Sequence, residues 1–378
     1  MSATGNGAAP GSALDGLKVV EFARYISGPY CGMILADLGA DVVKVETPGG
    51  DPSRREGPWV GERSGYYAQM NRNKRGTTID ARSDEGREQL RELLADADVF
   101  IENFRPGVLE AMGLGLDVLA ELNPGLITAS VSGFGRTSPI NDRAAFDCIV
   151  QVLSGLAWTT GGEDDREPLL IGTYLVDVGA GLVATIGVLA ALAQRGVDGL
   201  GQHVDATMID AALALLGVEV IGAAGSGEDP VRMRNLDRTS APANAYEASD
   251  GWVYVHAGPD HFWRRAMEAT GQPQALELEE LATEALRLEN RELGDGFLAS
   301  WVAGHTAAEA IEILGGAGVP VARINTITEA LDDPDLKLSE RIVTVADGEG
   351  HEFPTALAPL RLSRSPLSIR RGVPDLSR

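Results

Sequence analysis

Asp177 is the residue whose position in the sequence most clearly indicates chemistry. It precedes residues 178–193, a segment that contains no charged residue. A carboxylate at the start of an apolar helix meets unpaired backbone N–H groups and the positive end of the helix dipole, which favour its ionised form. A partly desolvated carboxylate can serve as a nucleophile or transfer protons. The alternative is a structural role, because Asp is also a preferred helix cap.

Two basic segments, residues 71–76 and residues 102–107, could bind a phosphate group. Their side chains of interest are Asn73, Lys74, Arg75, Asn103, Phe104 and Arg105. Loops that precede a helix offer free backbone N–H groups as well as positive charge. Phe104 could also stack on a nucleotide base. Solvated loop charges are an equally good interpretation of both segments.

Several common cofactor motifs are absent from the sequence. The turn after the first predicted strand, Ala23–Pro29, lacks the Gly-x-Gly-x-x-Gly pattern of dinucleotide-binding proteins, and its proline removes a backbone N–H. Neither a P-loop nor a Gly-x-Ser-x-Gly hydrolase motif occurs. The five histidines form no close pair of metal ligands. We therefore expect neither NAD nor a metal ion.

The composition argues against several kinds of partner. Of the 378 residues 44% are apolar, enough for a sizeable core, and the net charge is −23. Such an acidic surface repels nucleic acid and anionic membranes, so a polyanionic ligand would need a local basic pocket. Two cysteines are too few for a disulfide framework and fit a reducing cytoplasm. Residues 1–13 lack a signal-peptide pattern and are interpreted as a flexible tail.

The apolar segment 178–193 is too short to be a good membrane span and is rich in Gly and Ala. We interpret it as a core helix. Its small residues would let another backbone come close, as at a subunit interface.

Strands and helices alternate in the first part of the chain. Residues 17–22 and 41–46 are predicted strands, joined by a helix over residues 30–38 that ends at Gly39. Further helices and strands are predicted at residues 84–97, 98–102, 107–112, 116–122 and 126–131. This alternation predicts an α/β fold with a doubly wound parallel sheet, whose ligands bind at the carboxyl ends of the strands.

The second part of the chain predicts three long helices and then a smaller unit. The helices are expected at residues 144–155, 177–195 and 204–216. The full expected organisation is a tail at 1–13, a large domain at 14–221, a linker at 222–242, a small α/β domain at 243–325 and a return to the large domain at 326–378.

Seven stretches in this order resemble the class III CoA-transferase family, which also includes α-methylacyl-CoA racemase. The stretches are residues 17–22 with 27–29, and residues 35–46, 73–75, 98–107, 122–127, 132–135 and 201–210. The resemblance implies a Rossmann-like large domain, a small domain and an interlocked homodimer. It also implies acyl-CoA and a carboxylic acid as substrates, with CoA as co-substrate.

The resemblance carries roles over to individual residues. Asp177 stands in the place of the family's nucleophile, although Val176 replaces the usual glycine before it, and Asp147 stands in the place of a supporting acid. Phe146 replaces the histidine of the racemases, which favours a transferase. The resemblance places CoA and substrate contacts at Ile26, Ser27, Asn73, Lys74, Arg75, Asn103, Phe104, Arg105 and Phe146.

Two departures from the family concern the substrates. Ile26 stands where formyl-CoA transferase has a glutamine, which suggests an acyl group that is larger or less polar than formate or oxalate. Thr47 replaces an arginine near the CoA phosphates, so the charge would have to come from Arg54, Arg55, Arg72, Lys74 and Arg75. A racemase and a catalytically silent CoA-binding subunit remain the alternatives.

Overall fold

The computed structural model describes residues 11–162 and 165–376. The chain forms two compact units. The larger unit consists of residues 1–156, 170–227 and 340–378, and the smaller unit of residues 157–169 and 228–339. Residues 1–10 of the expected tail lie outside the described residues.

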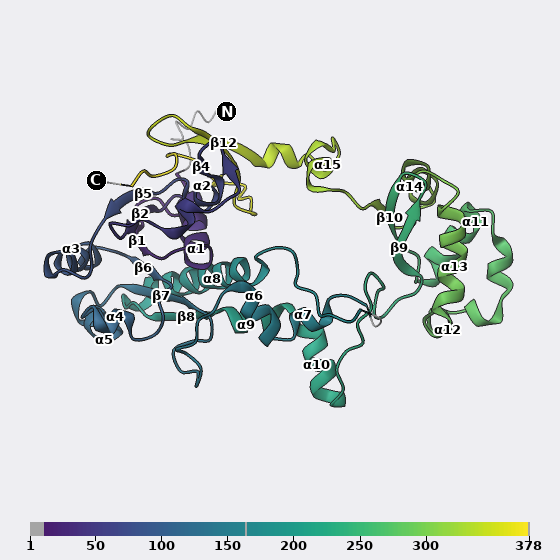
Figure 1. Ribbon diagram of the computed structural model, residues 1–378, viewed down its shortest axis with the longest axis horizontal. Coiled ribbons are helices and arrows are strands. Elements are labelled where there is room, and N and C mark those ends of the chain that lie inside the picture. The colour runs from purple at the N-terminus through teal and green to yellow at the C-terminus, as the bar shows by residue number, and fades with distance from the viewer. Residues whose placement is uncertain (1–10, 163–164, 377–378) are drawn as a thin grey trace, which may run out of the picture. The chain divides into compact units, whose positions relative to one another are not determined.

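Six parallel strands form the main sheet of the larger unit (Figure 1). Their order across the sheet is β5 (Arg75–Thr78), β2 (Asp41–Glu46), β1 (Lys18–Phe22), β6 (Val99–Glu102), β7 (Ile127–Ser132) and β8 (His203–Thr207). Val20 of β1 lies opposite Val43 on one side and Phe100 on the other. The order of the strands reverses between β1 and β6, and ligands of α/β sheets bind at such a point. The predicted α/β fold with a parallel sheet is confirmed.

Helices pack on both faces of this sheet, because the side chains of a strand alternate between the two faces. On one face Val19 of β1 shares a cluster with Leu35 and Val188, and on the other Val20 shares a cluster with Leu90. The helices up to residue 226 are α1 (Ser27–Asp37), α2 (Gly65–Asn71), α3 (Asp84–Ala95), α4 (Val108–Ala111), α5 (Leu116–Leu122), α6 (Asp147–Leu153), α7 (Leu156–Thr159), α8 (Leu175–Asp198), α9 (Met208–Leu215) and α10 (Gly217–Ser226).

Two hairpins complete the larger unit. They are β3 (Trp59–Val60) with β4 (Arg63–Ser64), and β12 (Ile342–Ala346) with β13 (Glu352–Ala356). Phe353 of β13 packs against Tyr67 of α2, so the end of the chain contributes to the core that its beginning forms.

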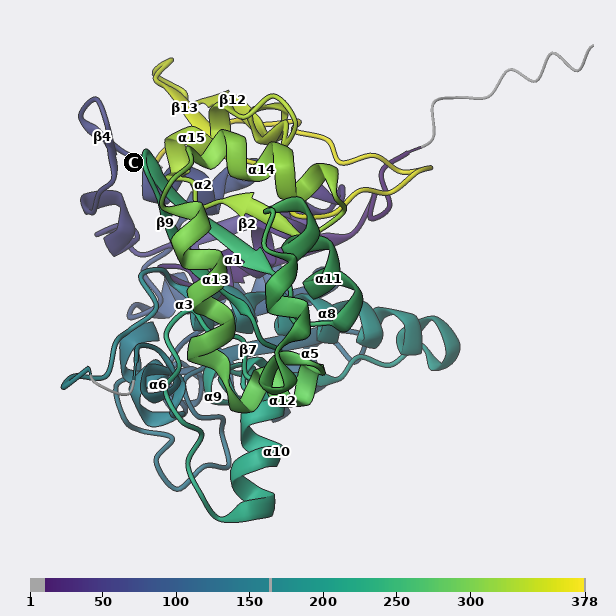
Figure 2. The same ribbon diagram turned by 90° about the vertical axis from the view of Figure 1, so that its right-hand side faces the viewer.

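The smaller unit is built on an antiparallel sheet with the order β11 (Val321–Arg323), β10 (Gly251–His256) and β9 (Ala243–Ala248). Helix α13 packs on β9, and α14 packs on β10 and β11 (Figure 2). The helices of this part are α11 (Asp260–Ala269), α12 (Glu284–Glu289), α13 (Arg291–Val302), α14 (Ala307–Gly316) and α15 (Ile327–Asp332).

Helix α8 uses its small residues inside the chain. A methyl group on Gly181 would lie 2.8 Å from the carbonyl oxygen of Ser27 at the start of α1, and one on Gly187 would lie 2.5 Å from Val204 of β8. By length and composition alone α8 could cross a membrane, but it packs on α1, β7 and β8. The expectation of close backbone approach is confirmed for α1, whose Ser27 carbonyl meets Gly181, while Gly187 accommodates the Val204 side chain of β8.

Two predicted boundaries were wrong. Residues 204–216 were expected to form one helix, but residues 203–207 form β8, the edge strand of the main sheet. Thr207 ends the strand and caps α9, since its side chain accepts a hydrogen bond from the N–H of Asp210. Helix α8 begins at Leu175, so Asp177 is its third residue and not its cap.

Candidate active site

A cavity of about 550 Å³ in the larger unit contains the Asp177 side chain. It is lined by Tyr25, Glu56, Tyr66, Phe146, Asp147, Cys148, Gln151, Leu170, Ile171, Gly172, Thr173, Tyr174 and Asp177. Asp177 is partly buried, and its carboxylate oxygens accept no hydrogen bond from the described residues. Its oxygens are thus free to meet a ligand in the cavity.

Asp147 caps the helix that carries Asp177. One of its oxygens accepts hydrogen bonds from the backbone N–H groups of Val176, at 2.8 Å, and of Asp177, at 3.0 Å. Gln151 donates to the other oxygen, and its own carbonyl accepts from the N–H of Ile171 at 2.9 Å. Asp147 is thus a helix cap that satisfies unpaired N–H groups of α8, although it lies in the first turn of α6.

The two carboxylates are electrostatically coupled. Burial, and then the charge of Asp147, raise the pKa of Asp177 to about 7. From the sequence we expected the helix terminus to favour the ionised form of Asp177. Burial and the charge of Asp147 reverse this expectation, and the N–H groups of residues 176 and 177 donate to Asp147. Near neutral pH Asp177 therefore exchanges readily between its charged and neutral forms.

The first turn of α1 lies beside the second turn of α8. The close contact of Gly181 with Ser27 and Tyr30 brings the loop that follows β1 next to Asp177. Asn103, which follows β6, ties the same loop: its side chain accepts from the N–H of Arg24 at 2.9 Å and donates to the carbonyl of Arg24 at 2.7 Å. Asn103 thus joins the two loops at the point where the strand order reverses.

Of the two neighbouring residues Tyr25 and Ile26, the structure places Tyr25 at the cavity. The Ile26 side chain is buried, and Ser27 is buried at the first position of α1. Tyr25 has a left-handed backbone with φ 64°, a conformation that costs a non-glycine residue energy and needs support from its surroundings. Sequence reasoning missed Tyr25, because nothing in the local pattern signals a positive φ.

Aromatic rings form two pairs at the cavity. Tyr25 and Phe146 meet edge to face with their centroids 6.0 Å apart, and Tyr66 and Tyr174 stack at 6.1 Å. Phe146 is 57% exposed. Burial, followed by the charge of Asp177, raises the pKa of Tyr66, which places that hydroxyl in the field of the carboxylate. Tyr66 and Tyr174 were not predicted to be site residues.

The loop after β6 holds the other expected CoA contacts. Phe104 packs edge to face on Phe22, and the guanidinium of Arg24 lies 5.6 Å from the centroid of the Phe104 ring. Arg105 is exposed. Glu102 supports the loop by accepting a hydrogen bond from the N–H of Phe104 at 2.7 Å, and burial raises the pKa of Glu102 to about 7.

In the other expected basic segment, residues 71–76, the side chains of residues 73–75 bind groups of the protein itself. The ammonium of Lys74 is buried and contacts Glu21 at 2.6 Å, the carbonyl of Pro29 and the side chain of Asn71. The buried side chain of Asn73 donates to the carbonyl of Ser368. Arg75 lies at the surface and pairs with Asp41 at 2.8 Å. These three residues therefore do not enter the site that we propose below.

Arg54 and Arg72 are also engaged in ion pairs. Arg54 pairs with Glu46 at 2.6 Å and Arg72 with Asp37 at 2.7 Å, the latter pair fully buried. Arg55 is exposed. The sequence could not show which of these basic residues are paired, because the acids that neutralise them are distant along the chain.

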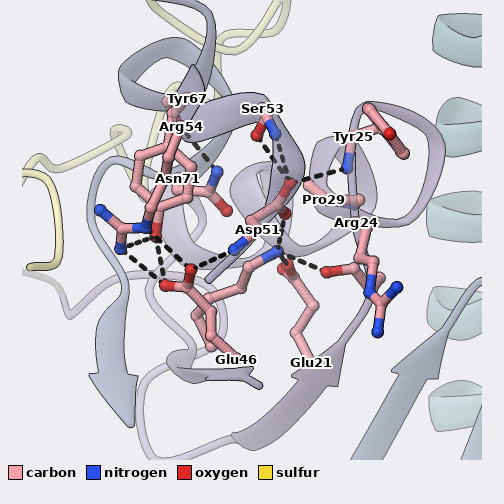
Figure 3. Close-up of polar contacts among 12 residues, drawn as sticks. Glu21, Arg24, Tyr25, Pro29, Glu46, Asp51, Ser53, Arg54, Tyr67 and Asn71 are labelled. Carbon is pink, nitrogen blue, oxygen red and sulfur yellow. Dashed lines mark hydrogen bonds and ion pairs between the residues drawn. The ribbon is translucent and has the colours of Figure 1, made fainter. Parts of the chain in front are cut away.

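A buried ionic network supports the loop that carries Tyr25 (Figure 3). Lys44 donates to Glu21 at 3.0 Å, to Asp51 at 2.9 Å and to the carbonyl of Ala23 at 2.6 Å. Asp51 also accepts from the N–H of Tyr25 at 3.4 Å. One lysine–aspartate pair thus holds the strained backbone of Tyr25, through its own N–H and through the carbonyl of Ala23.

No histidine is among the residues that line the cavity, although all five lie within residues 11–162 and 165–376. Across those same ranges no group of three or more His, Cys, Asp and Glu side chains is arranged to hold a metal ion. The ionisable groups that line the cavity are the acids Glu56, Asp147 and Asp177, the Tyr hydroxyls and the Cys148 thiol.

Comparison with known proteins identifies the family. The model of CoA-transferase family III matches residues 14–378. The chain belongs to this family. Its membership, and the class III CoA-transferase that the sequence predicted, are thereby confirmed.

Two curated relatives and one solved structure illustrate the similarity. Over 361 residues the chain is 38% identical to succinyl-CoA–D-citramalate CoA-transferase of Chloroflexus aurantiacus, covering 94% of this chain and 89% of the relative. It is 34% identical to succinyl-CoA:mesaconate CoA-transferase of Haloarcula hispanica, covering 96% and 91%. A CAIB/BAIF family protein from Brucella suis is 36% identical with a TM-score of 0.86, covering 97% of each chain.

Proposed function

We propose that this protein transfers CoA from an acyl-CoA thioester to a carboxylic acid through a covalent intermediate on Asp177. The observation that carries the proposal is a carboxylate with free oxygens in a cavity, on a helix end held by a second carboxylate. Desolvation makes such a carboxylate a stronger nucleophile once it is ionised. Both relatives named above are CoA-transferases, which supports the same reaction type here.

The reaction proceeds in four balanced steps. An oxygen of Asp177 attacks the carbonyl carbon of the donor thioester, the C–S bond breaks, and a mixed anhydride and CoA thiolate result. The thiolate attacks the aspartyl carbon and releases the donor acid as a carboxylate, leaving an aspartyl-CoA thioester. The acceptor carboxylate attacks this thioester, giving a second anhydride and thiolate. The thiolate then attacks the acceptor carbonyl carbon, which forms the new acyl-CoA and restores Asp177.

Asp147 acts on this reaction by position and charge. Its hydrogen bonds to residues 176 and 177 fix the first turn of α8, so that the Asp177 side chain starts from one backbone geometry. Its negative charge helps to keep the pKa of Asp177 near neutrality. A carboxylate with this pKa is also a better leaving group in the reverse direction than an alkoxide, which suits a reversible exchange.

The CoA moiety is proposed to lie along the loops that follow β1 and β6. Asn103 links these loops, the Phe104 ring offers a surface for the adenine, and Arg24 and Arg105 supply positive charge for the phosphates. The dimer that the family resemblance implies is also a proposal. Large apolar side chains exposed on α8 and α10, Ile186 at 67% and Val218 and Ile221 at 75% each, would be covered in a homodimer.

The proposal is tested by intact-protein and peptide mass spectrometry. Wild-type protein is incubated with each member of an acyl-CoA panel, without acceptor acid. We expect a hydroxylamine-sensitive gain in mass on the peptide that contains Asp177, and no gain in Asp177→Ala. Cys148→Ser serves as the control, because a thiol in the same cavity could otherwise take the label.

Two outcomes would contradict the proposal. Exchange of solvent deuterium into the α-carbon of the thioester without transfer would indicate a racemase. Binding of CoA without labelling or exchange would indicate a silent subunit. Phe146 stands against the racemase, because its ring cannot carry the second proton-transfer group that such an enzyme uses.

A further inference from the structure

We infer that the acyl subsite beside Asp177 takes an acyl group without a second carboxylate, and that Tyr25 is a specificity-determining residue of this subsite. The inference rests on the proposed transferase function and narrows its substrate class. Three features carry it: the charge of the cavity lining, the aromatic walls and the way in which Tyr25 is held.

The charged residues that line the cavity are all acidic. Glu56, Asp147 and Asp177 line the cavity, and no Lys, Arg or His is among its lining residues in the part of the chain that is described. A carboxylate at the far end of an acyl chain would have to give up water without gaining a cation. It would also be repelled by the acids that line the cavity, more strongly than in bulk water.

The walls are made of apolar and aromatic surface. Phe146 and Tyr25 form one wall, Tyr66 and Tyr174 the other, and Leu170 is also part of the lining. Rings of this kind gain from contact with alkyl or aryl groups and offer at most a hydroxyl to a charged one. The surface thus favours an uncharged chain or ring on the carbonyl that Asp177 attacks.

Tyr25 is a firm part of this wall because buried charges hold its backbone. The N–H of Tyr25 donates to Asp51, and Lys44 binds both Asp51 and the carbonyl of Ala23. With φ at 64°, the side chain is directed by a backbone that a relaxed tyrosine rarely adopts. A wall held in this manner cannot easily move aside for a different acyl shape.

This substrate class differs from the substrates named in the two relatives. Succinyl, citramalate and mesaconate groups all carry a second carboxylate. Overall similarity at 34–38% identity thus predicts a dicarboxylic substrate, while the lining of the cavity predicts an uncharged acyl group.

The test compares two donors of equal chain length, one with and one without the second carboxylate, and a third donor with an aromatic acyl group. Butyryl-CoA and succinyl-CoA have four-carbon acyl chains, and phenylacetyl-CoA probes the aromatic walls. Each donor converts Asp177 to the same aspartyl-CoA thioester, so the rates of mass gain are directly comparable. We expect butyryl-CoA or phenylacetyl-CoA to label at least tenfold faster than succinyl-CoA. Equal or faster labelling by succinyl-CoA would overturn the inference and leave the transferase proposal intact, whereas no labelling by any donor would overturn the transferase proposal itself.

Two variants and one control test whether the lining of this cavity determines the preference between donors. Glu56→Gln removes one negative charge from the lining and is expected to raise the succinyl-CoA rate relative to butyryl-CoA at least threefold. Glu62→Gln removes an exposed charge outside the lining and should leave the ratio unchanged. Tyr25→Ala should raise the rate with phenylacetyl-CoA relative to butyryl-CoA. Unchanged ratios in both Glu56→Gln and Tyr25→Ala would remove the role of this cavity in selecting the acyl group.

Discussion

One oxygen of Asp147 binds the backbone N–H groups of both Val176 and Asp177, and so ends the helix that carries the proposed nucleophile. The same carboxylate raises the pKa of Asp177 by its charge. Asp147 therefore acts both through its hydrogen bonds to the helix and through its charge on Asp177. Substitution can separate these two contributions.

We predict that Asp147→Asn moves the pH profile of Asp177 labelling to lower pH. The variant keeps an acceptor oxygen but loses the charge, which is the second cause of the raised pKa of Asp177, after burial. The rate of labelling should rise through about pH 7 in the wild type and at a lower pH in the variant. Asp142→Asn, an exposed change in the same segment, should leave the profile in place. An identical profile for Asp147→Asn would show that the two carboxylates are not coupled.

We expect Asp177→Asn to be more stable than the wild type at pH 8, and to lose this advantage at pH 4. The pKa of Asp177 is about 7 in the folded protein and near 3.8 without the fold, so its contribution to stability is full below about pH 4 and is lost as the pH rises through 7. Replacing the charged side chain should raise the free energy of unfolding at pH 8 by about 2 kcal/mol, a figure that allows for the partial exposure of Asp177. Urea unfolding of both proteins at the two pH values measures it. A variant that is equally destabilised at both would argue against a raised pKa.

Lys44→Met should destabilise the larger unit strongly. It leaves the buried Asp51 without its lysine and Glu21 with Lys74 alone, and removal of one partner of a buried ion pair costs about 3–5 kcal/mol. Lys18→Met breaks the exposed pair with Asp96 and should have no measurable effect. Urea midpoints of the two variants provide the comparison. Similar midpoints would mean that the buried network adds little to stability.

A matched pair of glycine substitutions in α8 tests its packing. Gly181→Ala would place a methyl group 2.8 Å from the Ser27 carbonyl and 3.0 Å from Tyr30, which should cost about 1–3 kcal/mol. Gly196→Ala in the same helix meets open space and should gain about 0.5–1 kcal/mol from helix propensity. Thermal melting distinguishes them. A gain at both positions would show that α1 and α8 are not in close contact.

The sequence predicted the sheet well where strands are buried on both faces. The strands β1, β2 and β6 are short apolar runs that end before the next helix begins. Residues 204–207 of β8 were predicted to be helical because the strand runs directly into α9. Edge strands with one exposed side lack a strong pattern, and only pairing with β7 distinguishes this one.

For the site, the sequence identified the acids and missed their surroundings. Asp177 and Asp147 both line the cavity, and Phe146 lies there as well. Lys74 and Arg75 looked like free cations because Glu21 and Asp41, which neutralise them, are more than 30 residues away in the chain. Tyr25 and Tyr66 give no sign in the sequence, because their roles come from a positive φ and from packing.

The buried amide of Asn73 joins the start of the fold to its end. Its oxygen accepts the N–H groups of Arg370 and Arg371, while its nitrogen donates to the carbonyls of Ala36 and Ser368. The larger unit thus depends on a contact between residues that lie 297 positions apart in the chain. A growing chain therefore lacks this anchor for its first strands and helices until residue 370 has been synthesised.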